Sequence, residues 1–149
     1  MNEDIVIVRK VREEADRQIA KYFEMRMNAA AKVAAYKKEF GIPIEDTAQE
    51  AKVIERNMGF IENEDLKKYF YYVTESLITQ SKKYQYLLNE GMRIAYNGTL
   101  GAFAYIAAKR VFPGANLIAY GSFDDAYNAV SAGDCDLAVL PVETAQPEK

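Results

Sequence analysis

Apolar residues recur every three or four positions through residues 4–38, which is the spacing of one face of an α-helix. The turn residues Gly41-Ile42-Pro43 then end this pattern. A second helix is predicted to end near Ile61, with Asp46 or Thr47 as its N-cap and Thr47-x-x-Glu50 as a capping box. A third helix is predicted over residues 65–88. Residues 1–90 are therefore predicted to form three helices, the first of them about 50 Å long.

The pattern changes near residues 89–92, because most of the glycines and prolines lie beyond this point. Short apolar runs at 93–96, 116–120 and 136–140 predict strands, and the last run has the apolar character of a buried parallel strand. Helices are predicted over 101–111 and from the N-cap Ser122 to Gly133. Residues 91–149 are thus predicted to be a small βαβαβ unit with a three-stranded parallel sheet and right-handed crossovers.

The apolar stripe of the first helix is longer than the rest of the helical region can cover. The second predicted helix is too short to lie across both of the long ones. We therefore expect a second copy of the chain to complete the stripe, which gives an intertwined helical homodimer.

Several polar side chains are predicted to face the interior of the helices. Arg26 and Lys37 fall near the centre of the first helix's stripe, and Arg9 lies on its flank. An unpaired buried cation is costly, so these positions favour a pocket for a small dianion. Long basic side chains also snorkel out of such stripes, and this alternative stays open for each residue taken alone. The other residues predicted to face inward are Glu50, Ser81 and Gln85.

Composition narrows the chemistry. The chain has no histidine, which excludes histidine acid–base catalysis and histidine metal sites, and its single cysteine excludes an internal disulfide. The net charge of −3 argues against a nucleic-acid binder, and no apolar run approaches the length of a membrane span. The acidic start lacks the features of a signal peptide. We expect a cytoplasmic protein that uses no cofactor and no metal.

Residues 1–90 resemble the all-helical chorismate mutase domain. The resemblance rests on an ordered set of motifs in all three predicted helices. These motifs are Val8-Arg9, Phe23-Glu24-x-Arg26-Met27, Tyr36-Lys37-Lys38, Pro43-Ile44-x-Asp46-x-x-x-Glu50 and Ser81-x-x-x-Gln85.

The resemblance implies a role for each matching residue. Arg26, together with Arg9 of the partner subunit, would bind the two carboxylates of chorismate, and Ser81 would help at the carboxylate end. Lys37 and Gln85 would hydrogen-bond the ether oxygen of the breaking bond. Glu50 and the Asp46 region would hold the ring hydroxyl. One position departs from the family, because Gln49 stands where an arginine is common.

Residues 92–143 are similar to the first βαβαβ unit of prephenate dehydratase, through Gly98-x-x-Gly101-Ala102-Phe103, Phe112-Pro113, Ser122-Phe123 and Val139-Leu140-Pro141-Val142-Glu143. The order of the two parts is similar to the bifunctional enzyme of phenylalanine biosynthesis. Glu143-Thr144-Ala145 departs from that family's Glu-Asn-Ser. We expect residues 91–149 to be a truncated first lobe without dehydratase activity.

Three functions follow from these observations. The first is a chorismate mutase that binds chorismate as its substrate. The second is a ligand- or partner-binding module in which the helices only dimerise the chain. The third is a purely structural helical dimer. Loss of chorismate on addition of the protein separates the first from the other two.

Overall fold

Three helices make up the first part of the protein in a computed structural model that describes residues 2–140. Helix α1 (Glu3–Glu39) begins at Asn2, whose side chain accepts a hydrogen bond from the amide of Asp4. Helix α3 (Glu64–Glu90) begins in the same way at Asn63. These helices agree with the predicted ones to within two residues. Both are followed closely by a glycine with positive φ, Gly41 and Gly91, a conformation that favours glycine.

Helix α2 (Thr47–Met58) differs from its prediction at both ends. Its N-cap is Asp46, which accepts from the amide of Gln49 at 3.0 Å, so the capping box predicted at Thr47 is wrong. The helix ends three residues before Ile61. The amides of Phe60 and Ile61 bond to carbonyls three residues back, which tightens the chain out of α-helical geometry.

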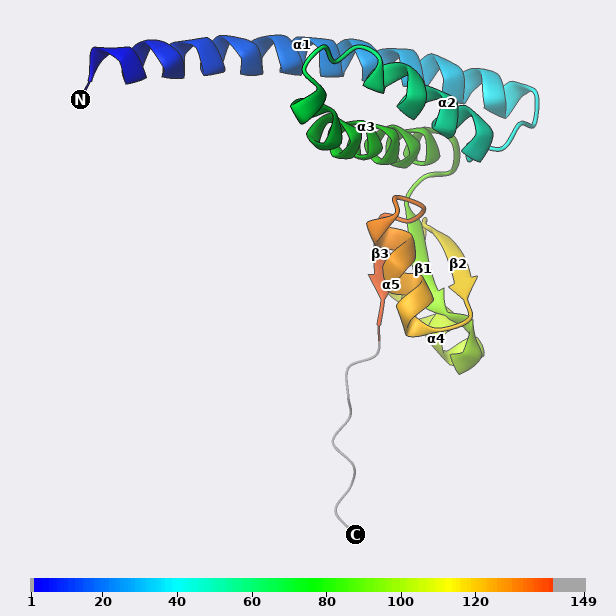
Figure 1. Cartoon of the computed structure of the whole chain (residues 1–149). Helices are drawn as coiled ribbons and strands as arrows, with labels where there is room; N and C mark the ends of the chain where they lie inside the picture. The colour runs from blue at the N-terminus through cyan, green and yellow to red at the C-terminus, as the bar shows by residue number, and fades with distance from the viewer. Residues whose placement is uncertain (1, 141–149) are drawn as a thin grey trace.

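The two long helices lie along each other over only part of α1. In Figure 1, α3 and α2 run beside the C-terminal half of α1, while its N-terminal half extends beyond them. Apolar side chains there are exposed, including Val8, Val11 and Ile19, which is 65% exposed. The chain by itself therefore leaves much of the predicted stripe uncovered, as the sequence indicated.

The second part is a three-stranded parallel sheet with two flanking helices (Figure 1). Its strands β1 (Arg93–Asn97), β2 (Asn116–Tyr120) and β3 (Leu137–Val139) are arranged in the order β2-β1-β3. A short 3-10 helix η1 (Gly98–Leu100) and helix α4 (Ala102–Val111) follow β1, and α5 (Phe123–Ser131) follows β2. Ser122 caps α5 through the amide of Asp125, as predicted. The predicted parallel sheet is confirmed.

Strand β1 is the centre of this unit. Its neighbouring residues Ile94 and Ala95 point to opposite faces of the sheet and both are fully buried, so both faces are covered. The core beside Ala95 consists of Ala126 and Ala129 of α5 and Cys135. The prediction that the third strand is buried is wrong, because β3 is an edge strand and Leu137 is 42% exposed. The predicted motif residues 141–145 lie outside the described residues.

The link between the two parts is only Gly91 and Met92, so β1 follows directly from the end of α3. Among residues 2–140, no helix is both long enough and apolar enough to cross a membrane.

Candidate active site

A cavity of about 210 Å³ lies where α1, α2, α3 and the loop after α1 meet. Six of the seven predicted site residues line it: Arg26, Lys37, Asp46, Glu50, Ser81 and Gln85. They come from three helices and one loop, and up to 59 residues of sequence separate them. The remaining lining residues are Val33, Ile44, Gln49, Val53, Ile78 and Lys82.

Arg26 reaches from α1 to α3. Its Nη1 donates to the carbonyl oxygen of Leu77 at 3.1 Å and to the hydroxyl of Ser81. The Ser81 hydroxyl in turn contacts the sulfur of Met27 at 3.8 Å. Burial, followed by repulsion from Arg56, lowers the pKa of the Arg26 guanidinium. The guanidinium remains charged at any ordinary pH, so its partial loss of hydration favours an anionic partner.

Lys37 faces the loop that follows α1. Its Nζ donates to the carbonyl oxygen of Ile44 at 2.8 Å, and Ile44 is itself buried. The loop returns over Lys37 because the amide of Ile42 bonds to the Lys37 carbonyl at 2.8 Å, next to the positive φ of Gly41. An ammonium has three donors, and this contact with Ile44 uses one of them.

Neutral oxygens hold these two cations. We expected anionic partners for buried cations, but within residues 2–140 neither Arg26 nor Lys37 forms a salt bridge. Their charges therefore remain uncompensated by close carboxylates on the same wall of the cavity. Such a wall suits a ligand that carries negative charge.

Glu50 enters the cavity from α2 and is paired with a residue that the sequence analysis missed. The Nζ of Lys82 lies 3.4 Å from the Glu50 carboxylate and 3.6 Å from Asp134. Burial by itself lowers the pKa of Lys82, but the two carboxylates outweigh this effect and the net pKa is raised. Its spacing from Gln85, three residues on the same helix, was a signal that Lys82 shares that face.

Ser81 and Gln85 are buried one turn apart on α3. The side-chain oxygen Oε1 of Gln85 has no hydrogen-bond partner within residues 2–140. A buried polar atom without a partner costs about 1–3 kcal/mol. This amide is therefore a group whose hydrogen bonding a bound molecule would complete.

Two residues of the predicted pattern differ from the rest. Arg9 lies 17 residues before Arg26 on one straight helix, about 25 Å away along its axis, and does not line the cavity of its own chain. Its contribution from a partner subunit remains a prediction. Gln49 does line the cavity, at the position where the resembling family commonly has an arginine.

The fold and the cavity together define a helical protein that can bind a small anion among cationic side chains. The sequence model of the family described as chorismate mutase type II matches residues 8–86, which include every lining residue named above. The chain belongs to this family. A second model, described as prephenate dehydratase, matches residues 94–146.

Curated relatives match only the second part of the chain. The prephenate dehydratase of Lactococcus lactis subsp. lactis (strain IL1403) is 39% identical over 54 residues, which are 36% of this chain and 19% of that protein. Arogenate dehydratase 4, chloroplastic, of Arabidopsis thaliana is 39% identical over 59 residues, 40% of this chain and 14% of that protein. The chain thus spans at most about a fifth of these relatives' length. No solved structure matches it significantly.

Proposed function

We propose that this protein rearranges chorismate to prephenate. The observation that carries the proposal is the meeting of Arg26, Lys37, Glu50, Ser81 and Gln85 in one cavity of a chain that belongs to the chorismate mutase type II family. The similarity of the second part to prephenate and arogenate dehydratases supports a place in phenylalanine biosynthesis.

The proposed reaction suits the residues present. The rearrangement is unimolecular and needs no nucleophile, no proton transfer and no cofactor, so a chain without histidine can catalyse it. The protein has to hold the compact, chair-like conformer of the substrate and to stabilise the negative charge that grows on the ether oxygen. Both tasks are electrostatic and geometric.

Each side chain then has a role that its present contacts support. Arg26, held by the Leu77 carbonyl and the Ser81 hydroxyl, binds one carboxylate, and Ser81 assists it. Lys37 uses a remaining N–H donor for the ether oxygen, and the Gln85 amide donates from α3. Glu50 and Asp46 accept from the ring hydroxyl.

We further propose that the active form is a homodimer. Ile19 and Phe23 of α1 and Phe70, Val73 and Leu77 of α3 line a hollow of about 720 Å³ that is almost entirely apolar. A second copy laid along α1 would bury this hollow together with the exposed Val8 and Val11. Arg9 of the partner subunit would then bind the second carboxylate, which Arg9 of the same chain is too distant to reach.

The decisive experiment is incubation of the purified chain with chorismate. We expect chorismate absorbance to fall and the product to give the NMR spectrum of prephenate. We expect no phenylpyruvate, because the matched dehydratase segment is at most about a fifth of its relatives' length. A folded, dimeric protein that leaves chorismate unchanged would contradict the mutase proposal and favour a binding module. Formation of phenylpyruvate would contradict the second expectation alone.

A further inference from the structure

Three charged side chains connect the cavity to the α/β part of the molecule. Glu50 of α2 lies in the cavity, Lys82 of α3 lies beside it, and Asp134 stands on the loop between α5 and β3. The Lys82 side chain is only 11% exposed and lies between the two carboxylates, 3.4 Å from one and 3.6 Å from the other. A side chain of the second part therefore contacts a residue that lines the pocket of the first.

The loop that carries Asp134 is held tightly against α3. Gly133 has a φ of +85°, and a Cβ atom there would lie 2.6 Å from Cγ2 of Thr79. The backbone amide of Asp134 donates to the Ala129 carbonyl at 2.9 Å. With this close approach to α3 and this anchor on α5, the Asp134 carboxylate has little freedom to move away from Lys82.

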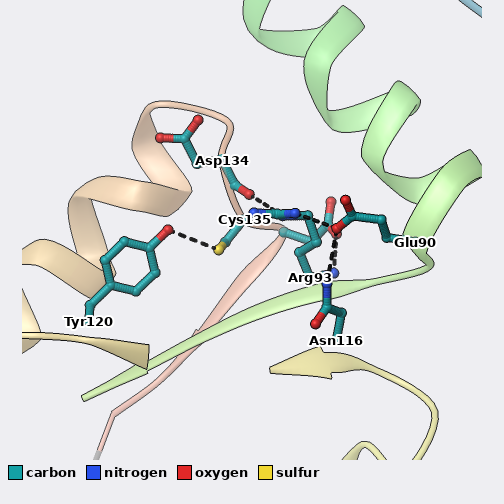
Figure 2. Close-up of polar contacts among 7 residues, drawn as sticks. Glu90, Arg93, Asn116, Tyr120, Asp134 and Cys135 are labelled. Carbon is teal, nitrogen blue, oxygen red and sulfur yellow. Dashed lines mark hydrogen bonds and ion pairs between the residues drawn. The ribbon is translucent and has the colours of Figure 1, made fainter. Parts of the chain in front are cut away.

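Arg93 fastens the same loop from its other side. Figure 2 shows its guanidinium between Glu90, at the end of α3, and the loop at Asp134. Its Nε donates to the Asp134 carbonyl oxygen at 2.8 Å, and it pairs with the Glu90 carboxylate. The guanidinium carbon also lies 3.9 Å from the centre of the Tyr86 ring. The loop and α3 are thus joined on both sides of Asp134.

Lys82 depends on this support. A lysine carries a compact charge on a flexible four-carbon stem, so one carboxylate alone fixes its ammonium poorly. Asp134 depends on Lys82 in turn, because its Oδ1 is buried and makes no hydrogen bond within residues 2–140. Removing either partner leaves the other charge buried without compensation.

We propose that Asp134 is a positioning residue for the cavity: it holds Lys82 so that the ammonium fixes the Glu50 carboxylate at the cavity wall. Lys82 also supplies a cation in the cavity to which Gln49 contributes none. The affinity for substrate therefore depends on the α/β part of the chain. This inference rests on the proposed mutase function and assigns to the second part a task within it.

The test is steady-state kinetics with chorismate on the full chain and its Asp134→Asn variant. We expect KM to rise roughly three- to tenfold, the effect of losing one coupled contact, with kcat within about twofold of wild type. Asp134→Glu keeps the carboxylate and should restore most of the affinity. Asp124→Asn is the matched control, because it removes the same charge from an exposed position in the first turn of α5 and should leave KM unchanged.

A double-mutant cycle separates positioning from general weakening. Lys82→Met should raise KM at least as much as Asp134→Asn, and the two changes together should raise it no further than Lys82→Met alone. Additive effects, or a wild-type KM in Asp134→Asn, would overturn the inference. If Asp134→Asn does not fold, a wild-type KM in Lys82→Met overturns it equally. An inactive wild-type chain would overturn the proposed function and this inference with it, whereas an active chain insensitive at residue 134 would overturn the inference alone.

Discussion

The two parts of the molecule bury different kinds of side chain. The helical part buries Asn57, Thr74, Ser81 and Gln85, and its buried hydrophobic residues are Ala34, Ile44 and Tyr86. In the α/β part the buried residues are mostly apolar: Ile94, Ala95, Ala108, Ala126, Ala129 and Cys135, with Asn97 as the polar exception. A region that buries polar groups around a cavity is arranged to bind, whereas a region that closes an apolar core is arranged to be rigid.

The difference extends to the surfaces that each part leaves open. In the helical part the largest hollow is apolar and runs along α1 and α3, where a second chain would fit. The small cavity beside it is polar and charged. The helical part thus offers one surface for association and one for chemistry, and the α/β part contacts the second through Asp134.

Substitution of Lys37 should have the largest effect. Its charge acts on an oxygen that becomes negative only in the transition state, so Lys37→Ala should lower kcat by about 10²–10³-fold with a smaller change in KM. Arg26→Ala should also raise KM strongly, about 10- to 100-fold, because a carboxylate clamp serves substrate and transition state alike. Steady-state kinetics measure both effects.

The neighbouring Lys38 is the control for this comparison. It is exposed on α1 outside the cavity, so Lys38→Ala should keep wild-type kinetics. Circular dichroism should report intact helices in all three variants. A near-normal kcat in Lys37→Ala would mean that this ammonium serves only the Ile44 loop and that the polar cavity is not the catalytic one.

A mixing experiment should have the next largest effect, because it tests whether the apolar surface joins two chains around the polar one. Arg9→Ala and Arg26→Ala are each expected to be nearly inactive. When they are unfolded and refolded together, half of the dimers contain one chain of each kind, and one of their two sites has both arginines. Roughly a quarter of the wild-type activity should return. If no activity returns although the mixed dimers form, Arg9 does not act across the subunits.

A change at the joint between the two parts should have the smallest effect. Gly133→Ala places a Cβ against Thr79 at a positive φ, so the free energy of unfolding should fall by about 1–3 kcal/mol. Gly114→Ala is the matched control, since nothing lies within 4 Å of its Cβ position and its φ is not positive. It should be neutral or slightly stabilising. Thermal unfolding of both variants measures the difference, and equal melting temperatures would mean that the loop is not tightly packed on α3.

Local signals in the sequence were sufficient for most of the elements. Apolar periodicity predicted α1 and α3 to within two residues, and the Ser122 cap predicted the start of α5. The buried third strand was predicted wrongly because its apolar run does not reveal its place at the sheet edge. The capping box at Thr47 was wrong because Asp46, one residue earlier, supplies the same hydrogen bond.

The site shows where sequence reasoning ends. The resemblance and the helical spacing selected six residues that the fold brings to one cavity. They did not select Lys82, because a lysine on a helix is ordinarily a solvent-exposed residue. Its importance comes from Asp134, which is 52 residues further along the chain and meets it only through tertiary structure. Contacts of this kind leave no periodic signal in either segment.

The two-residue link at Gly91 and Met92 has a consequence for motion. A longer linker would let two folded parts tumble separately in solution. Here α3 leads straight into the central strand β1, and the Arg93–Glu90 and Lys82–Asp134 pairs cross the joint on either side of it. We therefore expect both parts to share one rotational correlation time, so that the backbone amides of α5 relax in step with those of α3.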